Sequence, residues 1–199
     1  MSHLQHLLDN NSSWVSMQTE RDAETFSRLA NGQSPDYLWI ACSDSRMPTT
    51  SQVGLGRGDM FVHRNIANQV KLTDTSTQAA IEFAVKYLGV KDIVVCGHYG
   101  CGGIAKAIAM QGAAADKIDE WVLPIRALYE TNAADLDKLD DDARLQRLCE
   151  LNVAKQVENI SLHETVQAAW QNNVPLAIHG LVYDLATGYL RDLDLTRKA

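Results

Sequence analysis

Short apolar segments that alternate with helical patterns constrain the fold of this chain more than any other feature. Tyr37–Cys42 is an uninterrupted apolar run, Asp59–His63 resembles a second strand, and Asp92–Cys96 is the clearest strand in the sequence. Such short runs are typical of strands buried on both faces, as in parallel sheets covered by helices. The 199 residues are enough for one domain with a sizeable core.

Helical patterns fill most of the remaining sequence. Helices are expected over residues 1–35, after Thr73 and Asp74 as far as Gly89, after the glycine-rich segment 97–103, over 116–129, and without a break over 141–170. Residues 175–193 alternate like two strands around Thr187-Gly188, a turn signal. The prediction is an α/β fold: a mostly parallel central β-sheet flanked by helices, an N-terminal helical arm, and an antiparallel edge hairpin near the C-terminus. We expect one domain over 1–199, with the arm at 1–35 and the α/β core at 36–199.

The charge and the apolar pattern exclude several classes of protein. The formal net charge of −7 argues against nucleic acid or an anionic membrane as a partner, because both need a basic face. No apolar run approaches the roughly 20 residues that span a bilayer, and the N-terminus does not resemble a secretory signal. We therefore expect a cytoplasmic protein, in which the four cysteines serve as ligands, thiols or core residues rather than disulfides.

Two clusters of metal-binding residue types follow predicted strands. Cys42 and Asp44 come at the end of the first strand, and His98 and Cys101 follow the strand that ends at Cys96. If the two strands are neighbours in a parallel sheet, their carboxyl ends meet at one edge. Two thiolates and an imidazole select zinc over magnesium or calcium. The four residues together therefore predict a zinc site, with glycines allowing the backbone to turn sharply beside it.

Each of these residues also has a simpler interpretation. A single buried cysteine such as Cys42 is often only a small core residue, Asp44 is suited to capping a turn, and His98 to a structural hydrogen bond. The glycine-rich segment after the strand is also compatible with a phosphate site, although it lacks the Gly-Lys-Ser/Thr ending of a P-loop. The coincidence of all four residue types after two strands favours the metal.

Asp44 and Arg46 bear on whether such a site is catalytic. Four protein ligands make a closed, structural zinc site, whereas catalysis requires an open position. Asp44 is the ligand best able to leave, and Arg46 is able to accept its carboxylate in a bidentate ion pair. Two thiolates also offset the charge of zinc, so a carboxylate that accepts a hydrogen bond from the reacting water helps the chemistry. We therefore expect Asp44 to alternate between zinc and Arg46.

Three blocks of the sequence closely resemble the signature of β-class carbonic anhydrases. They are Cys42-Ser43-Asp44-Ser45-Arg46, Phe61-Val62-His63-Arg64-Asn65, and Cys96-Gly97-His98 with Gly100-Cys101-Gly102-Gly103. The resemblance extends over nearly the whole chain, to His179–Tyr183. It implies zinc-dependent hydration of carbon dioxide to bicarbonate and a proton, a homodimer or homotetramer, and an N-terminal arm that grips the partner subunit.

The resemblance further points to a bacterial, bicarbonate-regulated subtype of the family. In that subtype bicarbonate binds a non-catalytic pocket and stabilises the closed site, and Trp39, Arg64 and Tyr183 match its residues. An arginine with an indole N–H and a phenol O–H is a plausible cradle for an oxyanion, although both aromatic residues are also suited to the core. The chain has Thr49-Thr50 where relatives commonly have an acidic residue, and it ends at Ala199, where relatives often continue into further helix.

Three other functions fit parts of the same pattern. The same zinc ligands would suit a hydrolase of carbonyl sulfide or carbon disulfide. A permanently closed site would suit a non-catalytic zinc or bicarbonate sensor. A thiol redox protein using Cys96 and Cys101 is the weakest alternative, because the Cys-x-x-Cys spacing is absent.

Overall fold

The structure is a computed structural model that describes residues 2–199. The chain divides into two compact units, Met1–Ser34 and Pro35–Ala199. The first unit contains α1 (His3–Arg21) and α2 (Thr25–Ala30). The hydroxyl of Ser2 begins α1 by accepting a hydrogen bond from the Gln5 N–H at 3.2 Å. The helix buries none of its residues and leaves a set of large apolar side chains exposed: Leu4, Leu7, Leu8, Val15 and Met17.

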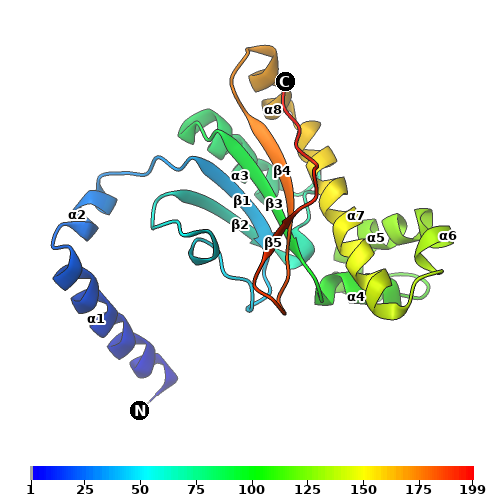
Figure 1. Cartoon of the computed structure of the whole chain (residues 1–199), viewed down its shortest axis with the longest axis horizontal. Helices are drawn as coiled ribbons and strands as arrows, with labels where there is room; N and C mark the ends of the chain where they lie inside the picture. The colour runs from blue at the N-terminus through cyan, green and yellow to red at the C-terminus, as the bar shows by residue number, and fades with distance from the viewer. Residues whose placement is uncertain (1) are drawn as a thin grey trace. The chain divides into compact units, whose positions relative to one another are not determined.

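The second unit is built on a five-stranded sheet with the order β2-β1-β3-β4-β5. The four parallel strands are β1 (Tyr37–Cys42), β2 (Met60–Asn65), β3 (Asp92–His98) and β4 (Ala177–Tyr183), and β5 (Leu190–Asp192) runs antiparallel to β4 (Figure 1). The parallel sheet, the helical arm and the antiparallel edge hairpin are confirmed. Because β1 and β3 are paired in parallel, their carboxyl ends lie side by side.

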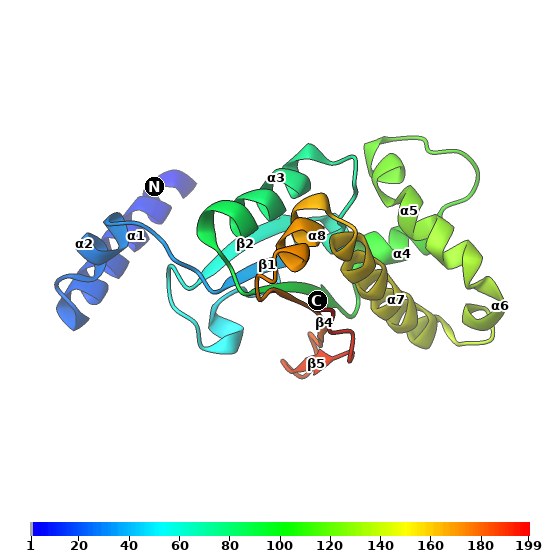
Figure 2. The same cartoon turned by 90° about the horizontal axis from the view of Figure 1, so that it is seen from above.

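The two faces of the sheet are covered in different ways. Figure 2 shows α3 (Thr75–Phe83), α7 (Asp141–Ser161) and α8 (Glu164–Gln171) gathered on one side of the strands. Leu38, Ile40 and their neighbours on this face form the largest apolar cluster with residues of these helices. The opposite face carries Trp39 and Ala41, which pack against Met47 and against side chains near the β4–β5 hairpin.

Three further helices lie beyond the carboxyl ends of the strands. They are α4 (Gly102–Ala109), α5 (Lys117–Thr131) and α6 (Ala133–Leu136), and they pack with α7 around a second apolar cluster. Cys42 and Cys101 belong to this cluster. The edge of the sheet where the metal-binding residues were predicted is therefore enclosed by helices.

Two sequence predictions about the helices and strands were wrong in detail. The helix expected without a break over 141–170 is interrupted, because the His163 Nδ1 accepts the Thr165 N–H at 3.1 Å and starts a new helix, α8. The second strand is displaced to Met60–Asn65. Asp74 caps α3 as expected, and the chain then passes through a π-helical turn before Gly89, whose φ is 66°. Within residues 2–199, none of the helices is long and apolar enough to cross a membrane.

Candidate metal centre

Three of the four predicted ligands converge at the carboxyl edge of the sheet. Cys42 ends β1, His98 ends β3, and Cys101 precedes α4. Their ligand atoms all lie within 4.8 Å of one another, the two sulfur atoms are 3.9 Å apart, and all three residues are buried. Gly100, with a φ of 67°, makes the sharp turn between His98 and Cys101. The pairing of β1 with β3 thus brings together residues 59 positions apart.

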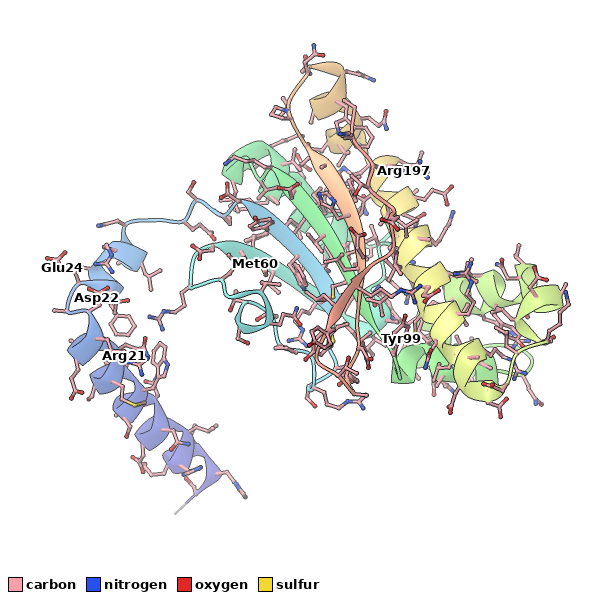
Figure 3. All side chains as sticks on the ribbon, viewed as in Figure 1. Arg21, Asp22, Glu24, Met60, Tyr99 and Arg197 are labelled. Carbon is pink, nitrogen blue, oxygen red and sulfur yellow. The ribbon has the colours of Figure 1, made fainter. Side chains whose placement is uncertain are left out.

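The hydrogen bonding of His98 determines which of its ring nitrogens is free to bind a metal. Nδ1 lies 3.0 Å from the carbonyl oxygen of Tyr99, so Nδ1 carries the proton and donates it. Nε2 is buried and has no hydrogen-bond partner. Tyr99, labelled in Figure 3 at the end of β3, is fixed at both ends: its N–H donates to the Tyr183 carbonyl at 3.1 Å and its hydroxyl donates to Glu150 at 2.9 Å. An unpartnered imidazole nitrogen beside two thiols fits a zinc ion.

The four thiols of the chain differ sharply in acidity. The hydrogen bond from Cys101 lowers the pKa of Cys42 to about 4, with smaller contributions from His98 and from the backbone N–H groups of Asp44 and Ala67, while burial opposes them. The resulting Cys42 thiolate raises the pKa of Cys101. Burial raises the pKa values of Cys96 and Cys149 to about 12, which leaves both as neutral packing residues. The negative charge of a thiolate is therefore concentrated at the predicted metal centre.

Asp44 lies beside this centre and is paired with Arg46. Its Oδ1 accepts hydrogen bonds from the backbone N–H and the Nε of Arg46 at 3.0 and 2.9 Å, and its Oδ2 accepts one from Nη2 at 2.7 Å. The hydrogen bond from the Arg46 side chain holds the pKa of Asp44 well below its usual value. Oδ2 is nevertheless only 3.8 Å from the Nε2 of His98. The structure thus contains the arginine-paired form of Asp44, and its binding to zinc stays a prediction.

The residues predicted to bind bicarbonate lie on the face of the sheet that carries Trp39. Trp39 is buried with its Nε1 unpartnered, and Tyr183 packs against the same apolar cluster. Arg64 donates from Nε to the carbonyl of Cys42 at 2.8 Å and from Nη2 to the carbonyl of Asp44 at 2.7 Å. Arg64 therefore holds the backbone of the metal loop. A buried N–H without a partner is costly, so Trp39 offers a donor to a ligand.

One contact to the metal centre was not foreseen from the sequence. The backbone N–H of Ala67, in the turn after β2, donates to the sulfur of Cys42 at 3.4 Å. Gly103 allows this turn to approach α4, because a Cβ at that position would lie 2.8 Å from the Ile66 side chain. The motif at residues 61–65 predicts the strand. The donor at Ala67 is a backbone N–H group, which every residue type except proline has, so the residue types do not predict this contact.

Comparison with known proteins relates this chain to carbonic anhydrases in both sequence and structure. Residues 37–190 match the family described as "Carbonic anhydrase". A carbonic anhydrase of Emericella nidulans is 41% identical over 190 residues, which cover 95% of this chain and 82% of that protein. A structure of tetrameric β-carbonic anhydrases from Sordaria macrospora superposes with a TM-score of 0.93 at 38% identity, covering 98% of both chains. A Coccomyxa β-carbonic anhydrase in complex with acetazolamide gives a TM-score of 0.95 at 34% identity, covering 100% of this chain and 90% of that one.

Proposed function

The chain belongs to the β-class carbonic anhydrase family and is a lyase of that kind, and we propose that it hydrates carbon dioxide reversibly at a zinc ion held by Cys42, His98 and Cys101. The observation that carries the proposal is the buried cluster of two sulfur atoms and an unpartnered imidazole nitrogen. Zinc, when bound there, would supply the Lewis acidity that helps water to ionise, although the two thiolates offset part of its charge. The substrate and the metal are those that the family implies.

The roles of the chain's own residues follow from their contacts. The Tyr99 carbonyl fixes the His98 ring so that Nε2 faces the metal. Arg46 holds the Asp44 carboxylate ionised beside the centre, where it is placed to accept a hydrogen bond from the reacting water. Arg64 holds the carbonyls of the loop that carries both Cys42 and Asp44. These residues position the metal ligands and the Asp44 carboxylate, and α4, α5 and α7 pack around Cys42 and Cys101.

We further propose that Asp44 switches the enzyme between two states. With Asp44 on Arg46, one metal position is free for water, whereas Asp44 on zinc closes the site as a fourth protein ligand. Support comes from the short distance, 3.8 Å, between the Asp44 carboxylate and the His98 Nε2. The carboxylate therefore lies beside the predicted ligands already, and this residue is where regulation would act.

Bicarbonate is the proposed regulator of this switch. The unpartnered Trp39 Nε1 and the nearby Tyr183 support a pocket for an oxyanion, with Arg64 supplying positive charge. Arg64 also holds the carbonyl of Asp44, so an anion that draws Arg64 away would release the loop. This assignment links the regulatory pocket to the catalytic carboxylate through one side chain.

We also propose a homo-oligomer, dimeric or tetrameric, in the cytoplasm. The exposed apolar side chains of α1 support association, because such a stripe on an arm needs a partner to cover it. The tetrameric structures from Sordaria macrospora, similar to this chain over 98% of its length, support the same assembly. The cytoplasmic location rests on the sequence alone.

Stopped-flow measurement of carbon dioxide hydration tests the function. The zinc-loaded protein is expected to be active at mildly alkaline pH, to lose activity in Asp44→Asn and Arg46→Gln, and to keep its zinc in both variants. Acetazolamide, with which the Coccomyxa enzyme forms a complex, is added as a candidate inhibitor of the hydration reaction. Absence of hydration at every pH up to mildly alkaline values, with zinc bound, would overturn the proposal in favour of a closed sensor.

The regulatory pocket is tested separately with Trp39→Phe, which keeps an aromatic ring but removes the indole N–H. Added bicarbonate is expected to inhibit initial hydration rates of the parent protein and to inhibit the variant much less. Trp170→Phe is the matched control, because the Trp170 N–H already donates to the Leu176 carbonyl at 2.8 Å. Equal inhibition of both variants and the parent would remove Trp39 from the pocket.

A further inference from the structure

The turn after β2 has a backbone conformation that side chains rarely allow. Ala67 has φ 61° and ψ 31°, and Asn68 has φ 46°. Alanine in this left-handed region costs about 1 kcal/mol or more, whereas asparagine adopts it more readily. Both residues are buried, so surrounding contacts must maintain the conformation. Strain of this kind persists where the surrounding structure holds a group in a fixed position.

The turn directs one N–H group at the metal centre. The Ala67 N–H points to the Cys42 sulfur at a distance of 3.4 Å from nitrogen to sulfur. The same sulfur receives a second backbone hydrogen bond from Asp44 and lies 3.9 Å from the sulfur of Cys101. The Asp44 donor belongs to the loop that carries the cysteine, whereas the Ala67 donor comes from a different strand connection.

An asparagine on α7 is hydrogen-bonded to this turn. The Asn152 Nδ2 donates to the Ala67 carbonyl at 2.9 Å, and only 1% of Asn152 is exposed. The direction of its amide is fixed, because the Gln156 Nε2 donates to the Asn152 Oδ1 at 2.9 Å. Gln156 is fixed in turn by the Val70 N–H, which donates to its Oε1 at 2.8 Å. The buried amides thus fix the peptide between Ala67 and Asn68. The left-handed φ and ψ of Ala67 then set the direction of the preceding peptide, whose N–H faces Cys42.

We propose that Asn152 is a positioning residue of the metal centre, which keeps the Ala67 N–H hydrogen-bonded to the Cys42 thiolate. A hydrogen bond to a thiolate withdraws charge from the sulfur and weakens its donation to a bound metal. Two thiolates otherwise offset the full charge of a divalent ion, so this withdrawal keeps the metal a stronger Lewis acid. The inference rests on the zinc site of the proposed function and extends it to a residue on a helix outside that site.

Cobalt-substituted protein gives a readout that a purely structural role would not change. Asn152→Ala is compared with Asn132→Ala, a matched control because Asn132 also donates from its side chain to a backbone carbonyl, that of Leu128, at 2.8 Å, at the end of α5. The thiolate-to-cobalt charge-transfer band is expected to move to lower energy in Asn152→Ala and to stay in place in Asn132→Ala. With zinc, kcat of Asn152→Ala is expected to fall about 10-fold. A folded Asn152→Ala protein with an unshifted band would overturn the inference.

Loss of a buried amide can prevent folding, so a second measurement uses the parent protein. With cadmium-113 in the site, the amide proton of Ala67 is expected to show scalar coupling to the metal through the sulfur of Cys42. Absence of this coupling while cadmium is bound would overturn the inference. Failure of both cobalt and cadmium to bind would instead overturn the metal site of the proposed function, so the two failures are distinguishable.

Discussion

Gly97 lies where β3 packs closely against α7, next to the metal-binding residue His98. It precedes His98 on β3, and a Cβ at this position would lie 2.6 Å from the Cγ2 of Val153 on α7. Apolar carbon atoms normally approach to about 3.5–4.0 Å, so Gly97→Ala requires a displacement of about 1 Å. Val153 is fully buried and has little space to move. We expect Gly97→Ala to lower the free energy of unfolding by about 1–3 kcal/mol.

A double-mutant cycle separates this overlap from a general loss of packing. Val153→Ala alone is expected to cost about 2 kcal/mol, because two buried methyl groups are lost. In the double variant the new methyl group enters the vacated space, so the combined cost should fall below the sum by about 1 kcal/mol or more. Urea unfolding at fixed protein and zinc concentrations measures all four free energies. Additivity within about 0.5 kcal/mol would refute the predicted overlap.

Three further predictions concern the acidity of the cysteine thiols, the acidity of Asp44, and the side chain that caps α8. After zinc removal, iodoacetamide should label Cys42 first and leave Cys96 unlabelled until unfolding, as mass spectrometry of peptides would show, because their pKa values lie at about 4 and about 12. The pairing with Arg46 lowers the pKa of Asp44, so the ionised pair stabilises the fold above the usual aspartate pKa of about 4 and less as pH falls. Urea midpoints of the parent and Arg46→Gln should therefore differ near neutral pH and converge in acid. His163→Ala should lower the free energy of unfolding by about 1 kcal/mol, whereas His163→Asn, which retains a capping side chain, should lower it less.

Much of the fold was predictable because its strands are short, apolar and bounded. The run Tyr37–Cys42 coincides with β1, and the strand expected at Asp92–Cys96 continues only two residues further, to His98. The metal-binding residues were predictable for a related reason, since parallel strands bring their ends to one edge of the sheet. The break at His163 was not predicted, because helical periodicity continues on both sides and only the capping side chain reveals the interruption.

The outer contacts of the site were beyond prediction for physical reasons. Asn152 lies within a helix and has the residue type of a surface position, but the approach of α7 to the turn after β2 buries it. The Ala67 donor is a backbone group, and its direction depends on a left-handed conformation that the residue type disfavours. Such contacts arise from tertiary packing between segments 85 residues apart.

The most direct test of the central claim is carbon dioxide hydration measured while the metal-free protein is titrated with zinc. The rate is expected to rise in proportion to added zinc and to level off at one zinc ion per chain, because residues 2–199 contain one such cluster, that of Cys42, His98 and Cys101. Cys101→Ser should remove the rise. Hydration activity without zinc, or no activity when one zinc ion is bound per chain, would contradict the account.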